Sequence, residues 1–140
     1  MIPLRSSDTV TLQVLQRALD ASALRHTAIS QNIANVDTPG YRALAVNFEQ
    51  KLREALNRSS RLPLATSQER HVRAGRTDLS GINPELVRME RTSLRHDGNN
   101  VDIEMETTKL AENQLLYGTL SRLISDKFRL LQSVITEGKR

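Results

Sequence analysis

Two groups of residues have side chains whose types could support chemistry. Asp102, Glu104 and Glu106 are carboxylates of the kind that general acid–base catalysis uses. No nucleophile or cavity-forming segment accompanies them, and they fall where a predicted helix begins, so the helix dipole accounts for their charge. His26 has no second His or carboxylate three or four residues away, which argues against a metal site. We expect His26 to be hydrogen-bonded at an interface between helices instead.

The segment Asp97–Asp102 looks superficially like a calcium-binding loop. Val101 stands at the fifth position, Asp102 stands where glycine is needed, and Thr108 stands where the bidentate glutamate belongs. We therefore expect a turn followed by the start of a helix, with a residue of the Asn99–Asn100 pair as the N-cap.

Other catalytic patterns are missing from the sequence. There is no cysteine, and so no thiol nucleophile, disulfide or Cys-ligated metal. We find no phosphate-binding loop, nucleophile elbow or zinc-ligand spacing. The sequence therefore predicts a protein that is not an enzyme and that has no cofactor and no metal.

The middle of the chain is rich in arginine, which raises the question of a nucleic-acid site. The formal net charge is +4 and the isoelectric point is about 10.0. Acidic residues are interspersed, however, and no aromatic residue lies between Phe48 and Tyr117 to stack on bases. We interpret the segment as a solvated surface and expect no nucleic-acid partner. The arginines are Arg58, Arg61, Arg70, Arg73, Arg76, Arg88, Arg91 and Arg95.

The composition favours long helices over a self-contained globule. Hydrophobic residues make up 38% of the 140 residues, below the roughly 45–50% of average globular domains. No basic start followed by an apolar run marks a secretory signal, and no stretch approaches the ~18 apolar residues of a membrane span. We expect no direct insertion into lipid, and a chain that is either cytoplasmic or exported without a cleaved signal.

A long helix is predicted over residues 8 to 36. Its apolar and small residues recur with alternating spacings of three and four, which is typical of a coiled-coil seam. Asp8 is the expected N-cap, with Ser6 and Ser7 as alternatives. Alanines near the middle allow close approach of more than one neighbouring helix. The seam positions are Leu12, Leu15, Leu19, Ser22, His26, Ile29, Ile33 and Val36.

The segment Asn35–Tyr41 is predicted to stop this helix. Pro39 lacks a backbone N–H and its ring clashes with a preceding turn. Together with Gly40, which accepts positive φ, it predicts the centre of a type II turn. The Asp37 side chain can bond freed backbone groups, and the Tyr41 ring can pack back on the helix while its hydroxyl finds a partner.

The region between residues 39 and 99 is predicted to be irregular. A short amphipathic helix is expected near residues 47–57, and short extended pieces at Leu62–Ala65 and Glu85–Leu94 leave room for a partly β arrangement. Serines, glycines and prolines interrupt any longer periodicity, so we expect disorder there in the free monomer.

A second long helix is predicted over residues 101 to 137. Leu110, Tyr117, Ile124 and Leu131 repeat every seven residues, and Leu116, Leu123 and Leu130 form an adjacent row. Such a face is wider than a two-stranded seam and predicts contact with at least two neighbours.

The predicted fold class is all-α, with two long terminal helices that pack as a coiled-coil or bundle layer in a helical assembly. Residues 1–38 form the N-terminal helix with its stop, 39–99 the irregular middle, and 100–140 the C-terminal helix. Folding back on itself would leave half of the C-terminal apolar face uncovered. We therefore infer that self-assembly or a partner completes the fold.

Two motifs resemble those of a known family. The string Asn32–Tyr41 resembles the signature near the N-terminus of bacterial flagellar rod and hook proteins. Gly98–Glu104, followed by Thr108–Leu115, Tyr117 and Lys127-Phe128, resembles the C-terminal motif of proximal rod proteins. Because the chain is also short, it is most similar to the flagella basal body rod protein family of the FlgB type. The FlgC type is the nearest alternative.

The resemblance implies a structural subunit of the proximal rod, which self-assembles into part of the hollow drive shaft of the flagellar basal body. The implied partners are copies of the chain, other rod proteins and the proteins at the junction of the membrane ring and the export gate. The implied location is the periplasmic rod, after type III export without a cleaved signal. A second hypothesis is a helical adaptor or chaperone for another exported protein.

The resemblance also implies residue roles. The helix stop and turn are assigned to Asn32, Ile33, Asn35, Asp37, Thr38, Pro39, Gly40 and Tyr41. Packing of the C-terminal helix on its neighbours is assigned to Leu110, Asn113, Gln114, Leu116, Tyr117, Leu120, Leu123, Ile124, Phe128 and Leu131.

Overall fold

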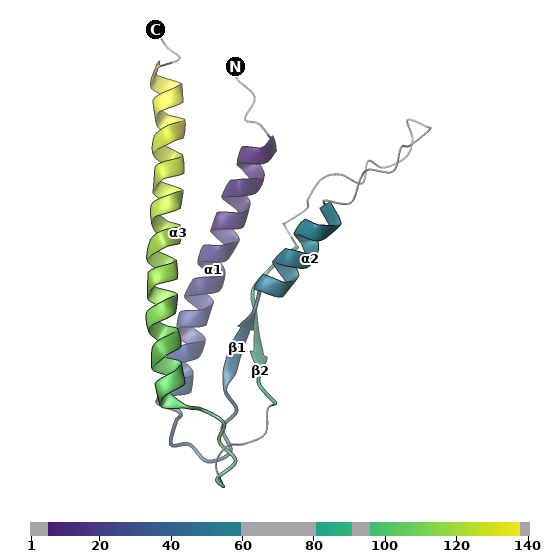
Figure 1. Cartoon of the computed structure of the whole chain (residues 1–140), viewed down its shortest axis with the longest axis vertical. Coiled ribbons are helices and arrows are strands. Elements are labelled where there is room, and N and C mark those ends of the chain that lie inside the picture. Colours follow the sequence, from purple (N-terminus) through teal and green to yellow (C-terminus); the bar gives the residue numbers. More distant parts are fainter. Residues whose placement is uncertain (1–5, 60–80, 91–95, 138–140) are drawn as a thin grey trace, which may run out of the picture.

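Two long helices dominate the computed structural model, which describes residues 6–59, 81–90 and 96–137. Helix α1 runs Ser6–Ala34 and helix α3 runs Ile103–Glu137. They pack side by side in opposite directions, so the start of α1 and the end of α3 lie at the same end of the molecule (Figure 1). The predicted fold class, with two packed terminal helices and a partly β middle, is confirmed.

A small strand pair and a third helix lie on the other side of α1 from α3 (Figure 1). Strand β1, Leu44–Asn47, pairs antiparallel with β2, Glu85–Arg88, and Leu44 stands opposite Arg88 in the register. Helix α2, Glu49–Ser59, follows β1 and extends away from the strand pair. The middle region is therefore not wholly irregular. Leu62–Ala65 and most of the arginine-rich segment lie outside the described residues.

The apolar core lies between α1, α2 and the strand pair. Its buried members are Ala21, Phe48 and Ile82, and Phe48 is only 3% exposed. Because Phe48 immediately precedes α2 and Val46 precedes it in β1, this short chain segment fills the space beside α1. The half-buried residues packed around the three are Val10, Val14, Ala18, Val46, Leu52 and Ala55.

Surface ion pairs add to this attachment of the middle region. Arg25 on α1 pairs with Glu49 at the start of α2, and Lys51 on α2 pairs with Glu85 on β2 at 2.6 Å. Exposed pairs of this kind contribute about 0–1 kcal/mol each, so the apolar contacts hold the middle region more than the charges do.

The start of α3 differs from the prediction. Asp102, and neither Asn99 nor Asn100, is the N-cap, because its Oδ1 accepts hydrogen bonds from the backbone N–H groups of Glu104 at 2.9 Å and Met105 at 3.3 Å. Asp8 also lies inside α1, which begins at Ser6. Both asparagines have partners elsewhere in the fold, which is why the cap role passes to the next polar residue.

A large apolar surface of α3 is left uncovered in the single chain. Leu115 is 75% exposed and Phe128 is 59% exposed. A monomer of this fold therefore leaves water in contact with side chains that normally drive folding. The exposed large apolar residues of α3 are Ile103, Met105, Leu115, Leu116, Tyr117, Leu123, Phe128, Leu130, Val134 and Ile135.

Candidate assembly site at the helix junction

The polar junction where α1 ends and α3 begins is organised by Asn99. This side chain is fully buried, and its Nδ2 donates to the backbone carbonyls of Asn35, Val36 and Thr38 at 2.9–3.0 Å. These three carbonyls belong to the turn that follows α1. Asn99 therefore holds this turn in place from more than 60 residues away along the chain.

The turn after α1 is held against the turn before α3. Gly40 has a φ of 72°, and the N–H of Tyr41 donates to the Thr38 carbonyl at 3.3 Å, which together describe the type II turn around Pro39. The N–H of Gly40 donates to the Asp97 carbonyl at 2.9 Å. A Cβ added to Gly98 would lie 3.6 Å from the Gly40 Cα, an ordinary van der Waals contact, so the φ of 80° is what favours glycine at position 98.

Asn32 joins α1 to the first residue of β1. Its Oδ1 accepts from the N–H of Leu44 at 2.8 Å, and its Nδ2 donates to the carbonyl of Leu44 at 2.9 Å. The amide thus pairs with Leu44 much as a neighbouring strand residue would. The hydroxyl of Tyr41 donates to the same Oδ1 at 3.3 Å.

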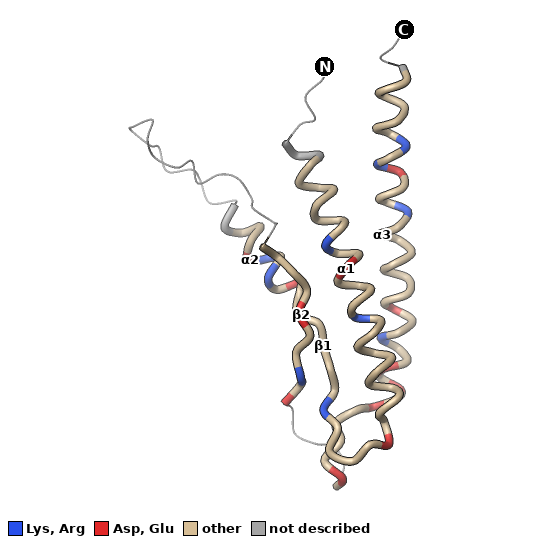
Figure 2. Tube along the Cα trace, turned by 180° about the vertical axis from the view of Figure 1, so that it is seen from behind, with Lys and Arg blue, Asp and Glu red and all other residues tan. Residues whose placement is uncertain are grey.

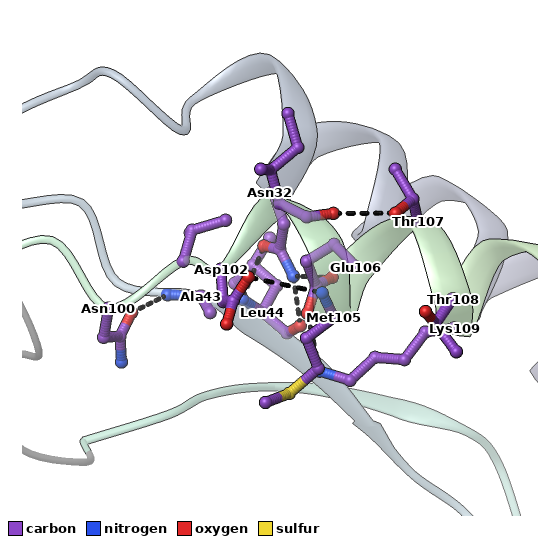
Figure 3. Close-up of polar contacts among 12 residues, drawn as sticks. Asn32, Ala43, Leu44, Asn100, Asp102, Met105, Glu106, Thr107, Thr108 and Lys109 are labelled. Atoms are coloured by element: carbon purple, nitrogen blue, oxygen red, sulfur yellow. Dashed lines mark hydrogen bonds and ion pairs between the residues drawn. The ribbon is translucent and has the colours of Figure 1, made fainter.

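Asn32 also reaches α3 through a buried carboxylate (Figure 3). Its Nδ2 donates to Glu106 Oε2 at 2.9 Å, while Lys109 Nζ lies 2.6 Å from Oε1. Glu106 is 3% exposed, and a buried carboxylate is tolerated only when it is paired and hydrogen-bonded. Both carboxylate oxygens of Glu106 have such a partner. Asn32 is therefore the residue at which α1, β1 and α3 meet.

Asn100 fastens the strand pair to the same junction. Its Oδ1 accepts from the N–H of Ala43 at 2.7 Å, and its Nδ2 donates to the carbonyl of Met89 at 2.9 Å. The N–H of Met89 donates to the Ala43 carbonyl at 2.8 Å. The two adjacent asparagines therefore have different tasks, one at the turn after α1 and one at the strand ends.

A second polar contact lies further along the interface of α1 and α3. Ser22 Oγ donates to Asn113 Oδ1 at 2.9 Å, and Asn113 Nδ2 donates to the Ser22 carbonyl at 2.9 Å. Ser22 is fully buried and Asn113 is 4% exposed. This reciprocal pair is satisfied only when the two helices have one particular axial alignment.

Burial changes the acidity of Tyr41. Desolvation of the phenolate raises the pKa of this hydroxyl above its ordinary value of 10.0. The positive charge of Arg88 opposes this rise in pKa and the negative charge of Glu106 adds to it. The hydroxyl is therefore held in its neutral form, which is the form that can donate to Asn32.

The residues assigned to the turn lie in three settings. Asn32 and Tyr41 belong to the hydrogen-bonded junction, and Ile33 is half-buried on α1. Asn35 Nδ2 donates to the Gln31 carbonyl at 2.8 Å, and Thr38 Oγ1 donates to Asn35 Oδ1 at 3.2 Å. The remaining three, Asp37, Pro39 and Gly40, are exposed on the turn.

The residues assigned to packing on α3 divide into two sets. One set is at least half-buried in the single chain: Leu110, Asn113, Leu120, Ile124 and Leu131. The other set is exposed: Gln114, Leu116, Tyr117, Leu123 and Phe128. His26 is likewise exposed on α1, so the interface expected for it is not made within one chain.

Sequence reasoning missed four residues of the junction and interface. The sequence pattern places Ser22 on the helical seam, favours Asn99 or Asn100 as an N-cap, and indicates that Glu106 complements the helix dipole. A usable signal was present, because Glu106, Asn113 and Leu120 form a seven-residue row. Polar residues on a buried row require partners, which points to a hydrogen-bonded interface.

Within residues 6–59, 81–90 and 96–137, no group of three or more His, Asp and Glu side chains could hold a metal ion. Over the same residues, none of the helices has the length and apolar character needed to cross a membrane. What the geometry does supply is a fixed relation between two helices and one strand.

Comparison with known proteins decides the family. Residues 12–42 match the family described as Flagella basal body rod protein. The chain is 40% identical over 129 residues to the flagellar basal body rod protein FlgB of Bacillus subtilis, an alignment that covers 92% of this chain and 95% of that protein. The chain belongs to the flagella basal body rod protein family. Its predicted resemblance to the FlgB type is confirmed.

Further relatives have the same name. FlgB of Borreliella burgdorferi is 34% identical over 123 residues, which cover 85% of this chain and 90% of that protein. FlgB of Escherichia coli is 30% identical over 136 residues, with 91% and 94% coverage. The members of this family are structural components of the flagellar basal body, so the chain is a rod subunit and not an enzyme.

Proposed function

We propose that the chain is a structural subunit of the proximal rod, and that it self-assembles through its terminal helices into part of the hollow drive shaft. The observation that carries this proposal is the exposed apolar surface of α3. Full burial of each large aliphatic or aromatic side chain stabilises by roughly 1.5–3 kcal/mol. The free energy of burying several such residues is comparable to the ~5–15 kcal/mol net stability of a whole domain. Association of copies that cover this surface is therefore strongly favourable.

The junction suits a subunit whose helices must be presented in one fixed way. Asn99 and Asn32 tie the end of α1 to the start of α3, and Pro39–Gly40 directs the chain out of the helical layer. We propose that neighbours then pack on the exposed set of α3 residues, which includes Leu116, Tyr117 and Leu123.

The partners and location follow from the same proposal. The partners are copies of the chain, other rod proteins and the proteins at the junction of the membrane ring and the export gate, in a homo- and hetero-oligomeric helical assembly. The subunit works in the periplasmic rod after type III export without a cleaved signal. The names of the relatives, which place them in the flagellar basal body rod, support this location.

Replacement of the Bacillus subtilis relative tests the proposal. A strain that lacks its own FlgB and expresses this chain should regain basal bodies and swim. The matched control is the same strain expressing a Leu120→Asp variant, because Leu120 is 8% exposed against α1 and a charge there should prevent folding. Failure of the unchanged chain to restore rods, despite its presence in the exported fraction, contradicts the proposal.

The adaptor or chaperone hypothesis predicts a different solution behaviour. Such a protein would be a stable monomer or dimer whose mass does not change with concentration. A rod subunit should associate as its concentration rises and gain helicity, measured by sedimentation and circular dichroism. A folded monomer that stays monomeric at high concentration supports the adaptor instead.

A further inference from the structure

We propose that Asp97–Gly98, in the turn before α3, is a site of spontaneous isoaspartate formation that is protected in the folded chain and reactive in the unfolded chain. Of all the aspartates and asparagines in the sequence, Asp97 alone is followed by glycine. Glycine has no Cβ to shield its backbone nitrogen and adopts conformations that other residues avoid, so the preceding carboxyl group can reach that nitrogen. The site is independent of the proposed rod function, because it depends only on whether this turn is folded.

The reaction joins two groups that are neighbours in the chain. The backbone nitrogen of Gly98 attacks Cγ of the Asp97 carboxyl group, the nitrogen loses its proton, and one carboxyl oxygen leaves as water. The product is a five-membered succinimide ring. Water then opens the ring. Cleavage of the bond between nitrogen and Cγ restores aspartate, whereas cleavage of the bond between nitrogen and the α-carbonyl carbon leaves the main chain running through Cβ and Cγ. This second product is isoaspartate, and its formation needs no oxidant and no cofactor.

The folded junction holds the reacting groups in other bonds. The turn before α3 lies beside the turn after α1, at the end of the molecule away from both termini (Figure 2). Asp97 Oδ1 accepts from the N–H of Asn99 at 3.1 Å, and the Asp97 carbonyl accepts from the N–H of Gly40 at 2.9 Å. Ring closure requires the carboxyl group to leave the Asn99 N–H and turn to the Gly98 nitrogen. The folded turn must therefore open locally before the ring can form.

Isoaspartate at position 97 would remove the bonds that this turn makes. The main chain gains one methylene group before Gly98, which is about 1.5 Å of extra length. The α-carbonyl that accepts from Gly40 becomes a free carboxylate, and Cγ becomes the peptide carbonyl, so the bond of Oδ1 to Asn99 is lost. The three bonds from Asn99 to the turn after α1 are 2.9–3.0 Å long. A displacement of the size of one carbon–carbon bond takes them out of hydrogen-bonding range.

The modification therefore distinguishes chains by their history. A chain that folds promptly keeps Asp97 in the closed turn, whereas a chain that stays unfolded accumulates isoaspartate and loses the ability to form the junction. The turn needs both members of the reactive pair, Asp97 for its bond to the Asn99 N–H and Gly98 for its φ of 80°. The repair chemistry that fits this site is methylation of the isoaspartate carboxyl group, which returns the chain to the succinimide.

Ageing of the full chain with and without urea tests the site. After storage in warm neutral buffer, the tryptic peptide His96–Lys109 is analysed by electron-transfer fragmentation, which separates isoaspartate from aspartate of the same mass. Isoaspartate at position 97 should form at least about tenfold faster in urea, because the folded chain reacts only through local opening. Asp102 in the same peptide is the internal control and should change little, because β-branched Ile103 follows it.

Two variants locate the reacting atoms in urea, where their effects on folding do not enter. Gly98→Ala adds a Cβ beside the attacking nitrogen, and Asp97→Glu requires a larger ring. Both should form the rearranged product at position 97 much more slowly than the unchanged chain. Formation that is as fast in Gly98→Ala as in the unchanged chain, or as fast in native buffer as in urea, would overturn the proposal.

A refolding step tests the consequence for the junction. Aged chains are diluted from urea, and their thermal unfolding is followed by circular dichroism beside that of freshly unfolded chains. Chains with isoaspartate at position 97 should unfold at a lower temperature, and treatment with a protein isoaspartate methyltransferase and S-adenosylmethionine should restore the original unfolding temperature. Modified chains that refold to the stability of fresh chains would show that the junction tolerates the change, and this result would also overturn the proposal.

Discussion

Ser22 and Asn113 exchange two hydrogen bonds at 2.9 Å inside the interface of α1 and α3, although 91 residues separate them in the chain. Both are nearly or fully buried, so neither can turn to water if the other is lost. A purely apolar interface of alanines and leucines would tolerate sliding of one helix along the other. This pair permits one alignment, in the way that a single polar residue can fix the register of a coiled coil.

Loss of this pair should destabilise the fold measurably. Asn113→Ala leaves the Ser22 hydroxyl without its acceptor in a buried site, which should cost about 1–3 kcal/mol in the free energy of unfolding. Urea unfolding followed by circular dichroism measures this. The neighbouring Gln114→Ala, at an exposed position, should change stability by less than ~0.5 kcal/mol. Equal losses of stability in the two variants would show that the hydrogen bonds of the buried pair do not stabilise the fold.

Asn99 should tolerate no acidic replacement. Asn99→Asp keeps the shape of the side chain but removes the N–H group that bonds three carbonyls, and it brings a negative charge to the C-terminal end of the α1 dipole. We expect a loss of about 2 kcal/mol or more, larger than the loss for Asn99→Ala. Gln13→Glu, at an exposed site of α1, is the amide-to-acid control. Thermal unfolding of the three variants measures which of them loses the most stability.

Substitution of Gly40 should act through backbone strain. Its φ of 72° is unfavourable for a β-branched residue, whereas a Cβ there would meet no atom within 4 Å. Gly40→Val should therefore destabilise by about 1–3 kcal/mol and block rod assembly while export continues. Gly40→Asn should be milder, because asparagine accepts this conformation more easily.

The control for Gly40 is Gly81→Val. Gly81 also has open space around an added Cβ, but its φ is not positive. Swimming and secretion assays of the three strains provide the readout. Normal swimming of the Gly40→Val strain would refute the assigned turn geometry.

Leu123→Asp should separate folding from assembly. Leu123 is 47% exposed, so a carboxylate there remains in contact with water in the single chain and should change the free energy of unfolding little. Incorporation into rods should be lost, because the proposed neighbour would have to bury the charge. Ala111→Asp, at an exposed position on another side of α3, is the control. Incorporation of the Leu123→Asp chain, detected in purified basal bodies, would mean that this flank stays open in the rod.

Alkaline pH should weaken the junction through Tyr41. Because burial raises the pKa of this hydroxyl in the folded state, the folded chain holds the proton at a pH where the unfolded chain releases it. Its contribution to stability is therefore complete below about pH 10 and is lost as the pH rises through the folded pKa. Tyr41→Phe should remove this part of the pH dependence. Unfolding curves of both proteins between pH 8 and pH 11 provide the measurement, and parallel pH profiles would contradict it.

Local chemistry made several features predictable from the sequence. The turn after α1 was predictable from two adjacent residues, because the ring of Pro39 and the missing side chain of Gly40 favour a type II turn with a positive φ at Gly40. The exposed apolar surface of α3 was predictable because a seven-residue repeat that is wider than one seam cannot be covered by one neighbour. The resemblance of both terminal segments to rod proteins was sufficient to predict the family.

The tertiary structure decided which polar side chains are paired. Asparagine at 32, 99 or 100 has the same chemistry in the sequence, and nothing local indicates that one binds a strand residue, one holds the turn after a distant helix and one fastens the strand ends. Each bond joins segments separated by loops whose path the sequence pattern does not specify. A hydrogen bond needs its donor and acceptor within about 3 Å, and only the folded chain brings such distant groups that close.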